Sequence, residues 1–217
     1  MQKRTRSSAD SEDLHGNAPD RCELALLLID VINDLEFPEG DQVARRARPM
    51  AKRLAELKSR AEQAHIPCIY VNDNFGRWRS DFNAQVRHCL SDGVRGQFLC
   101  AALTPRKSDY FVLKPKHSGF YQTCLELLLE HLGTKTLLIA GISTESCVTF
   151  TANDAFLRGY SMVVLEDGCA SGFDELHRHA IRQMQRMLDA RIARCKDISF
   201  ARSRDETVLR VARRRSR

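Results

Sequence analysis

Residues 136–159 read TLLIAGISTESCVTFTANDAFLRG, an apolar run followed by a turn and a helical segment. The run Thr136–Ala140 is apolar after its first residue, which is typical of a strand covered on both faces. Glu145–Leu157 is predicted as a helix that ends before Gly159, because glycine commonly terminates helices. A strand that leads directly into a helix is the repeating unit of parallel α/β folds.

The same alternation of strand and helix continues in both directions along the chain. The predicted strands are Leu24–Ile29, Ile66–Val71, Tyr110–Leu113, Thr136–Ala140, Ser161–Leu165 and a short Arg191–Arg194. The predicted helices are Asp41–Gln63, in which Pro49 could introduce a kink, Tyr121–Leu132, Glu145–Leu157 and Asp174–Asp189. We therefore predict the α/β class, with a parallel sheet and right-handed crossovers. Residues 72–104 are the least regular stretch and are expected to carry binding residues.

The chain of 217 residues suits one α/β domain. We expect this domain at residues 23–200, after a disordered polar arm at residues 1–22 and before an Arg-rich tail at residues 201–217. The tail holds seven Arg against two acidic residues, so it carries most of the net charge of +6. A nucleic-acid domain should carry its basic side chains on the fold itself. We therefore favour a solvated tail over a contact with a polyanion, and we do not expect a nucleic-acid partner.

The cysteines and the apolar runs indicate the compartment. There are eight Cys, and no two have the CxxC spacing of a redox or zinc pair. The run Leu24–Ile29 is far too short to cross a bilayer, and the polar N-terminus is no secretory signal. These features predict a cytoplasmic protein with free thiols and no membrane partner.

Three reactive side chains follow predicted strands. Asp30 follows Leu24–Ile29, Lys114 follows the strand that starts at Tyr110, and Cys147 follows the strand that starts at Thr136. Because the carboxyl ends of parallel strands meet at one edge of a sheet, we expect the three to face the same crevice.

This trio has the chemistry of a covalent hydrolase. A thiol in the first turn of a helix is expected to have a lowered pKa, and the backbone N–H groups there could hold an oxyanion. Asp30 could take the proton of Cys147 and deliver it to a leaving amine, while Lys114 would favour the thiolate by its charge. Taken singly, each residue also has a structural interpretation, as a buried Cys under a helix, a surface Lys and a capping Asp.

Several motifs resemble those of the isochorismatase-like cysteine hydrolase superfamily. They are Asp30-Val-Ile-Asn33-Asp34, Lys114-Pro-Lys-His-Ser118-Gly-Phe120, Gly141-Ile-Ser-Thr144-Glu-Ser-Cys147-Val148, Thr151, Asp154-Ala155, Gly159-Tyr160 and Asp167-Gly-Cys-Ala170. The resemblance covers about residues 24–192. It implies a Rossmann-like three-layer α/β/α fold with a six-stranded parallel sheet, and a homo-oligomer, either dimer or tetramer. It also implies a catalytic triad of Asp30, Lys114 and Cys147.

The same resemblance implies a cis peptide bond between Ile142 and Ser143, which would aim the N–H groups of Ser143 and Cys147 at the oxyanion. Two departures narrow the activity. Nicotinamidases carry an Asp-x-His metal pair after the second strand, whereas residues 72–78 read NDNFGRW without His, so we predict no metal and no cofactor. Isochorismatases proper cleave a vinyl ether and lack the nucleophilic Cys. In the first motif Ile32 and Leu35 replace the common Gln and Phe, which puts the pocket shape in doubt.

We therefore predict a hydrolase of a small-molecule amide or carbamoyl C–N bond that acts through a thioester on Cys147, with the substrate and water as partners. The relatives it resembles are N-carbamoylsarcosine amidase and nicotinamidase. Phe75, Arg77, Trp78 and Phe120 are candidates for substrate binding. Arg77 could instead pair with Asp73 or Asp81, and the aromatic residues could be core or subunit contacts. The alternatives are a vinyl-ether hydrolase and a non-catalytic binding protein. His117 is assigned no role.

Overall fold

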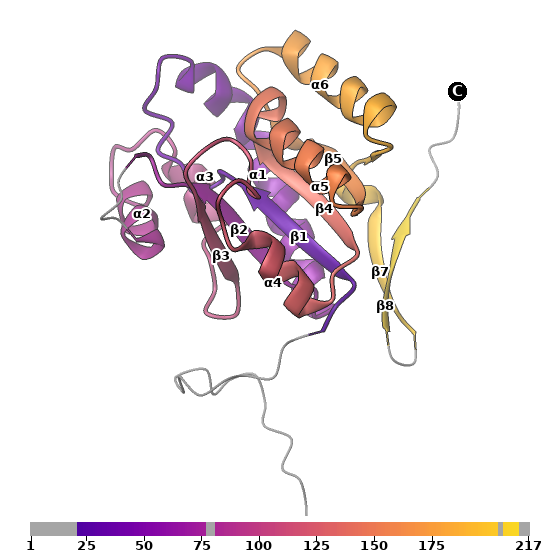
Figure 1. Ribbon diagram of the computed structural model, residues 1–217. Coiled ribbons are helices and arrows are strands. Elements are labelled where there is room, and N and C mark those ends of the chain that lie inside the picture. Colours follow the sequence, from indigo (N-terminus) through magenta and orange to yellow (C-terminus); the bar gives the residue numbers. More distant parts are fainter. Residues whose placement is uncertain (1–20, 77–80, 204–205, 213–217) are drawn as a thin grey trace, which may run out of the picture.

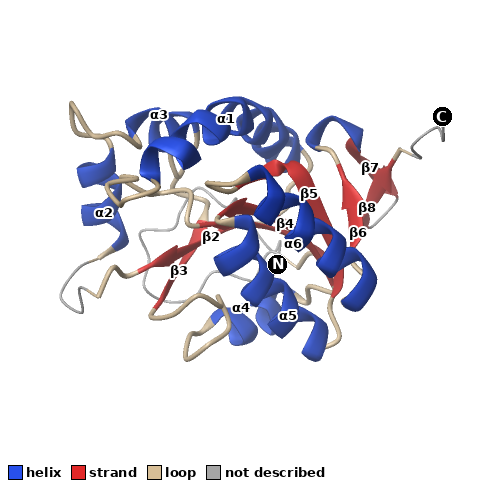
Figure 2. Ribbon diagram, turned by 90° about the horizontal axis from the view of Figure 1, so that it is seen from above, coloured by secondary structure: helices blue, strands red, loops and turns tan. Residues whose placement is uncertain are grey.

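The computed structural model describes residues 21–76, 81–203 and 206–212. A six-stranded parallel sheet lies between two layers of helices (Figures 1 and 2), which confirms the predicted three-layer α/β/α fold. The strand order is β3-β2-β1-β4-β5-β6. The strands are β1 Leu24–Ile29, β2 Cys68–Asp73, β3 Tyr110–Lys114, β4 Thr136–Ile142, β5 Ser161–Ala170 and β6 Arg191–Ala193.

The helices mostly follow the predicted ranges. They are α1 Gly40–Gln63, α2 Phe82–Cys89, α3 Gln97–Ala102, α4 Leu125–Leu132, α5 Thr149–Leu157 and α6 Asp174–Met187, with a π-helical turn η1 at Thr144–Val148 and a 3₁₀ turn η2 at Cys195–Asp197. Pro49 lies inside α1, which stays a single helix. The short helices α2 and α3 lie in the stretch that was expected to be irregular.

The two faces of the sheet bury different side chains of β1. Leu24, Leu26 and Leu28 point to the face covered by α1 and α3, whereas Ala25, Leu27 and Ile29 point to the face covered by α4, α5 and α6 (Figure 2). All six are buried. This explains why β1 is apolar without alternation, since both of its faces are removed from water.

The direction in which successive strands are added to the sheet reverses between β1 and β4, although these two strands are parallel. From β1 the chain adds β2 and β3 on one side, and then returns to place β4, β5 and β6 on the other. The crevice at the carboxyl ends of such a strand pair is the usual place for a ligand in an open α/β sheet. Asp30 follows β1 and η1 follows β4, so both lie at this point.

A C-terminal antiparallel hairpin was not predicted. It consists of β7 Ile198–Ser203 and β8 Glu206–Val211, and it packs on the α1 side of the domain. Ile198 is buried there, and Phe200, Leu209 and Val211 are partly buried. The expected boundary after residue 200 thus falls inside β7, because alternate apolar residues cover α1 despite the many Arg around them. Residues 1–20 of the predicted arm at residues 1–22 lie outside the described part, as do the last five residues of the chain.

Within the described ranges no helix has both the length and the apolar character needed to cross a bilayer.

Candidate active site

Asp30 is held at the end of β1 in a left-handed conformation, with φ +50°. Asp is among the few residues that adopt this conformation readily. Its N–H donates to the Val71 carbonyl at 3.0 Å, and its Oδ1 accepts from the Asp73 N–H at 2.7 Å. The side chain is buried.

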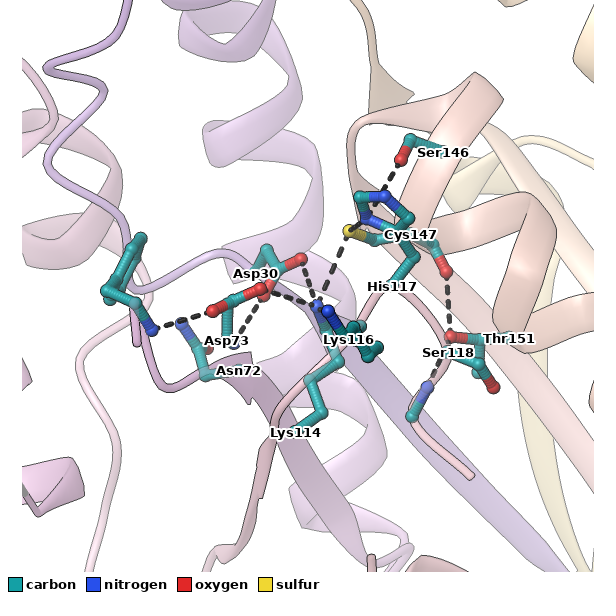
Figure 3. Close-up of polar contacts among 12 residues, drawn as sticks. Asp30, Asn72, Asp73, Lys114, Lys116, His117, Ser118, Ser146, Cys147 and Thr151 are labelled. Atoms are coloured by element: carbon teal, nitrogen blue, oxygen red, sulfur yellow. Dashed lines mark hydrogen bonds and ion pairs between the residues drawn. The ribbon is translucent and has the colours of Figure 1, made fainter. Parts of the chain in front are cut away.

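Lys114 ends β3 and is completely buried. Its Nζ lies 2.9 Å from Asp30 Oδ2 and 3.6 Å from Asp73 Oδ2, and it donates to the Lys116 carbonyl at 3.2 Å. A buried ammonium is costly unless acceptors surround it, and these three oxygens provide them. Figure 3 shows the ammonium between the two carboxylates and the sulfur of Cys147.

Cys147 lies in the π-helical turn between β4 and α5. Its Sγ accepts from Lys114 Nζ at 3.4 Å. Thr151 Oγ1 donates to the Cys147 carbonyl at 2.7 Å and accepts from the Gly119 N–H at 3.0 Å, which ties α5 to the loop after β3. The structure therefore brings Asp30, Lys114 and Cys147 together.

The chain turns sharply before this cysteine. The Ile142–Ser143 peptide bond is cis. The Val148 N–H donates to the Ser143 carbonyl at 3.2 Å, five residues back. The Cys147 amide thus belongs to the first turn, where N–H groups have no acceptor in a preceding turn. The oxyanion role of Ser143 and Cys147 stays a prediction.

Gly141 brings β4 close to β1. It has φ +136° and is the register partner of Ile29. A Cβ at this position would lie only 2.0 Å from the Ile29 carbonyl oxygen. A side chain would therefore force the two strands apart just before Asp30 and the turn that carries Cys147.

Asp30, Lys114 and Cys147 shift one another's pKa values. Burial raises the pKa of the Asp30 carboxyl above its usual range, although Lys114 and the Cys147 thiol oppose this. Burial and then the Asp30 charge raise the pKa of the Cys147 thiol to about 12, against the opposing effect of Lys114. Burial lowers the pKa of Lys114, but the charges of Asp30 and Cys147 outweigh it and the net shift is upward.

The predicted lowering of the thiol pKa is therefore wrong for the resting site. The thiol is buried beside a carboxylate, and these effects exceed the attraction expected from the helix end. The two upward shifts favour the protonated forms of Asp30 and Cys147, and the upward shift of Lys114 favours its cationic form.

Two residues of the site were missed from the sequence. Asp73 ends β2 and is the register partner of Lys114. The rule that found the triad would have found it, had the second strand been extended from Val71 to its true end. His117 Nδ1 lies 3.7 Å from the Cys147 sulfur and 3.3 Å from Ser146 Oγ. Nothing in its sequence context indicated this contact.

Of the four candidate substrate residues, the structure describes Phe75 and Phe120, and these two lie in different environments. Phe75 is 44% exposed just after β2, and its N–H donates to Asp73 Oδ1 at 2.6 Å. Phe120 is only 4% exposed, and its ring lies 5.9 Å from that of Tyr160 in the core on the α4–α6 side. Phe120 is therefore a core residue, which was the alternative to substrate binding for this position. The predicted positions 77 and 78 lie outside the described residues.

The described part of the chain contains no group of three or more His, Cys, Asp or Glu side chains placed to hold a metal ion.

Comparisons with known proteins identify related sequences and structures. The isochorismatase domain model matches residues 24–194. The uncharacterized isochorismatase family protein YaaI of Bacillus subtilis is 37% identical over 172 residues, which are 79% of this chain and 94% of YaaI. The ureidoacrylate amidohydrolase RutB of Methylobacterium radiotolerans is 29% identical over 77% of this chain and 75% of its own length.

A solved structure has the same fold. N-carbamoylsarcosine amidase from Thermoplasma acidophilum superposes with a TM-score of 0.62 and 25% identity, over 81% of this chain and 98% of that one. The family model spans every strand of the parallel sheet and all of the triad, from β1 to β6. By its sequence and by its fold, the chain belongs to the isochorismatase family.

Proposed function

We propose that the protein is a cysteine hydrolase of a small-molecule amide or carbamoyl C–N bond, with a thioester on Cys147 as intermediate. The observation that carries the proposal is the position of Lys114 Nζ, 2.9 Å from Asp30 Oδ2 and 3.4 Å from the Cys147 sulfur. The names of two relatives, an amidohydrolase and an amidase, support the same bond type.

The acylation step begins with a proton transfer within the site. Asp30 takes the proton of Cys147, and the thiolate attacks the carbonyl carbon, so that a C–S bond forms and the carbonyl electrons move to oxygen. The N–H groups of Ser143 and Cys147 hold this oxygen. Lys114 remains cationic throughout and stabilises whichever of its two neighbours carries the negative charge. Asp30 then gives its proton to the nitrogen as the C–N bond breaks.

Deacylation uses the same groups in reverse order. Water attacks the thioester carbonyl and loses its proton to Asp30, and the C–S bond then breaks. The sulfur leaves as a thiolate and regains the proton from Asp30, which restores the starting site. Each proton that Asp30 accepts is returned, so the cycle consumes only substrate and water.

We propose that this chemistry needs no metal, because of the residues after β2. The position of the nicotinamidase Asp-x-His pair reads Asp73-Asn74-Phe75 here. Asp73 uses one oxygen for the Phe75 N–H at 2.6 Å and directs the other to Lys114 at 3.6 Å. Its carboxylate is thus engaged by the chain itself.

We also propose a cytoplasmic homo-oligomer, either dimer or tetramer. Large apolar side chains are exposed on two neighbouring helices of one layer, and surfaces of this kind often mark subunit contacts. They are Leu127 on α4 and Phe150, Phe156 and Leu157 on α5. Analytical ultracentrifugation tests this, and a monomer at all concentrations would contradict it.

Ammonia release from a panel of small amides and carbamoyl compounds tests the activity. The panel includes nicotinamide, N-carbamoyl amino acids and biuret-like ureas. Cys147→Ala should lose turnover, whereas Cys124→Ala, which changes an exposed thiol at the start of α4, should keep it. Retained turnover in Cys147→Ala would reject the nucleophile. No turnover of any amide would favour vinyl-ether hydrolysis or a binding protein.

A further inference from the structure

His117 lies beside the reacting sulfur but belongs to none of the groups used above. Its Nδ1 is 3.7 Å from Cys147 Sγ and 3.3 Å from Ser146 Oγ. In the view of Figure 3 the sulfur lies between the Lys114 ammonium and the His117 ring. Lys114 is completely buried, whereas His117 is exposed, so the imidazole approaches the sulfur from the solvent side.

The ring is held in place by two neighbouring elements. Ser146 contacts it from the π-helical turn, and the ring of Phe150 on α5 lies 5.4 Å from it at an interplanar angle of 37°. His117 also follows Lys116, whose carbonyl accepts from Lys114 Nζ at 3.2 Å. The backbone before the imidazole is thus fixed to the triad itself.

The sulfur needs more stabilisation than Lys114 alone can give. The Lys114 ammonium is shared among Asp30, Asp73 and the sulfur. Burial and the Asp30 charge raise the pKa of the Cys147 thiol to about 12, so the thiolate is costly to form. A second donor on the sulfur would lower that cost without competing for the same ammonium.

We propose that His117 is a further catalytic residue, whose Nδ1–H donates a hydrogen bond to the Cys147 thiolate on the side away from Lys114. It does so when the thiolate forms and again when the sulfur leaves the thioester. His117 keeps its proton throughout, because the thiol proton still passes to Asp30. In the resting thiol state the same N–H can donate to Ser146 Oγ. This inference rests on the proposed function of the site.

Alkylation of Cys147 by iodoacetamide measures the thiolate directly and needs no substrate. His117→Phe keeps an aromatic ring against Phe150 but removes the donor. His117→Asn places an amide N–H close to the Nδ1 position, whereas His117→Gln places it farther out. His131→Phe is the matched control, because His131 is exposed in the last turn of α4, at the opposite end of the sheet.

Rates are followed by mass spectrometry of the Cys147 peptide across a pH series, with folding checked by circular dichroism. Among the described residues, Lys114 and His117 contact the sulfur and Asp30 raises the pKa of the thiol. Asp30 and Lys114 are therefore left unchanged in every variant. His117→Phe should slow alkylation about tenfold at a given pH and move its midpoint upward, since a lost hydrogen bond to a charged group costs roughly that much. His117→Asn should stay within about threefold of the unchanged protein, and His131→Phe should not differ.

Equal or faster alkylation in His117→Phe would overturn the proposal. An equal loss in His117→Asn and His117→Phe would also overturn it, because it would indicate packing and not donation. If His117→Phe does not fold, the Asn and Gln variants decide, since only Asn should retain the rate. With an amide substrate the loss should appear in kcat and not in KM. If no amide is hydrolysed, the proposed function fails, while the alkylation rates still decide the role of His117.

Discussion

Asp73 and Lys114 are register partners on β2 and β3, and the Asp73 carboxylate lies 3.6 Å from the Lys114 ammonium. Lys114 therefore lies between two carboxylates, of which Asp30 is nearer at 2.9 Å and more deeply buried. Asp30 follows β1 and Asp73 ends β2, and the two acids have different environments. They should respond differently to the same substitution.

Asp73→Asn should keep turnover within about tenfold, because its ion pair with Lys114 is long and partly exposed. Removal of one negative charge near the thiol should also make Cys147 somewhat easier to ionise, so iodoacetamide should label it faster. Steady-state kinetics and labelling rates check both expectations. A loss of activity as large as that of a triad variant would show that Asp73 takes part in the chemistry.

Asp30→Asn should separate labelling from turnover. The proposed base is lost, so turnover should fall by about 10²–10⁴-fold. The Asp30 charge also raises the pKa of the Cys147 thiol, so its removal should speed alkylation. Asp92→Asn, at an exposed position before α3, is the control and should change neither. A parallel fall in both rates would contradict the proton transfer.

The pH profile of kcat/KM should be broad and shifted upward at both ends. Activity requires one proton on the Asp30–Cys147 pair. On the acid limb, the pair goes from two protons to one as the pH rises. This step should lie above the usual range of an Asp because burial raises the pKa of Asp30. The alkaline limb marks loss of the last proton, near the pKa of about 12 for Cys147. Rates from about pH 4 to about pH 11 check this, and an alkaline fall near the usual thiol pKa would contradict it.

The raised pKa of Asp30 also has a consequence for stability. The folded state holds this proton more tightly than the unfolded chain does, so Asp30 favours folding below the ordinary Asp pKa of 3.8. That contribution is lost as the pH rises from 3.8 through the raised pKa. Asp30→Asn should remove the dependence, so its unfolding free energy should fall less over this range. Denaturant titrations of both proteins at several pH values measure it, and parallel curves would contradict the assignment.

Lys114→Met should destabilise the fold by about 3–5 kcal/mol, because it leaves the buried Asp30 without its counter-charge. Lys135→Met is the control. Its ion pair with Glu23 is mostly exposed, so the change should be within about 0.5 kcal/mol. Urea unfolding provides the free energies. Equal small changes in both variants would indicate that Asp30 is neutral or solvated in the folded protein.

The sequence allowed the fold and the meeting of Asp30, Lys114 and Cys147 to be predicted for one shared reason. An apolar run that ends in a polar or reactive residue marks both a buried strand and the edge of the sheet where ligands bind. Asp30, Lys114 and Cys147 all follow that rule. The sign of the thiol pKa shift could not be predicted in this way, since it depends on how deeply the sulfur is buried and how near Asp30 lies.

The missed features depend on tertiary contacts. The hairpin of β7 and β8 was hidden by its Arg content, although Phe200 and Leu209 alternate with polar residues and cover α1. His117 reaches the sulfur only because a loop after β3 returns over the π-helical turn. No local pattern encodes such a contact, because its two partners are thirty residues apart.

Gly141 has a consequence for how freely the rest of this protein could be altered. The spacing between acid and sulfur is set by two backbones that touch where the Ile29 carbonyl meets a residue without a side chain. The relative position of the Asp30 carboxylate and the Cys147 sulfur thus depends on the contact between these two strands. A designer who alters the loops around the site would therefore have to keep glycine at position 141, together with the loop after β3 that carries Lys116 and His117.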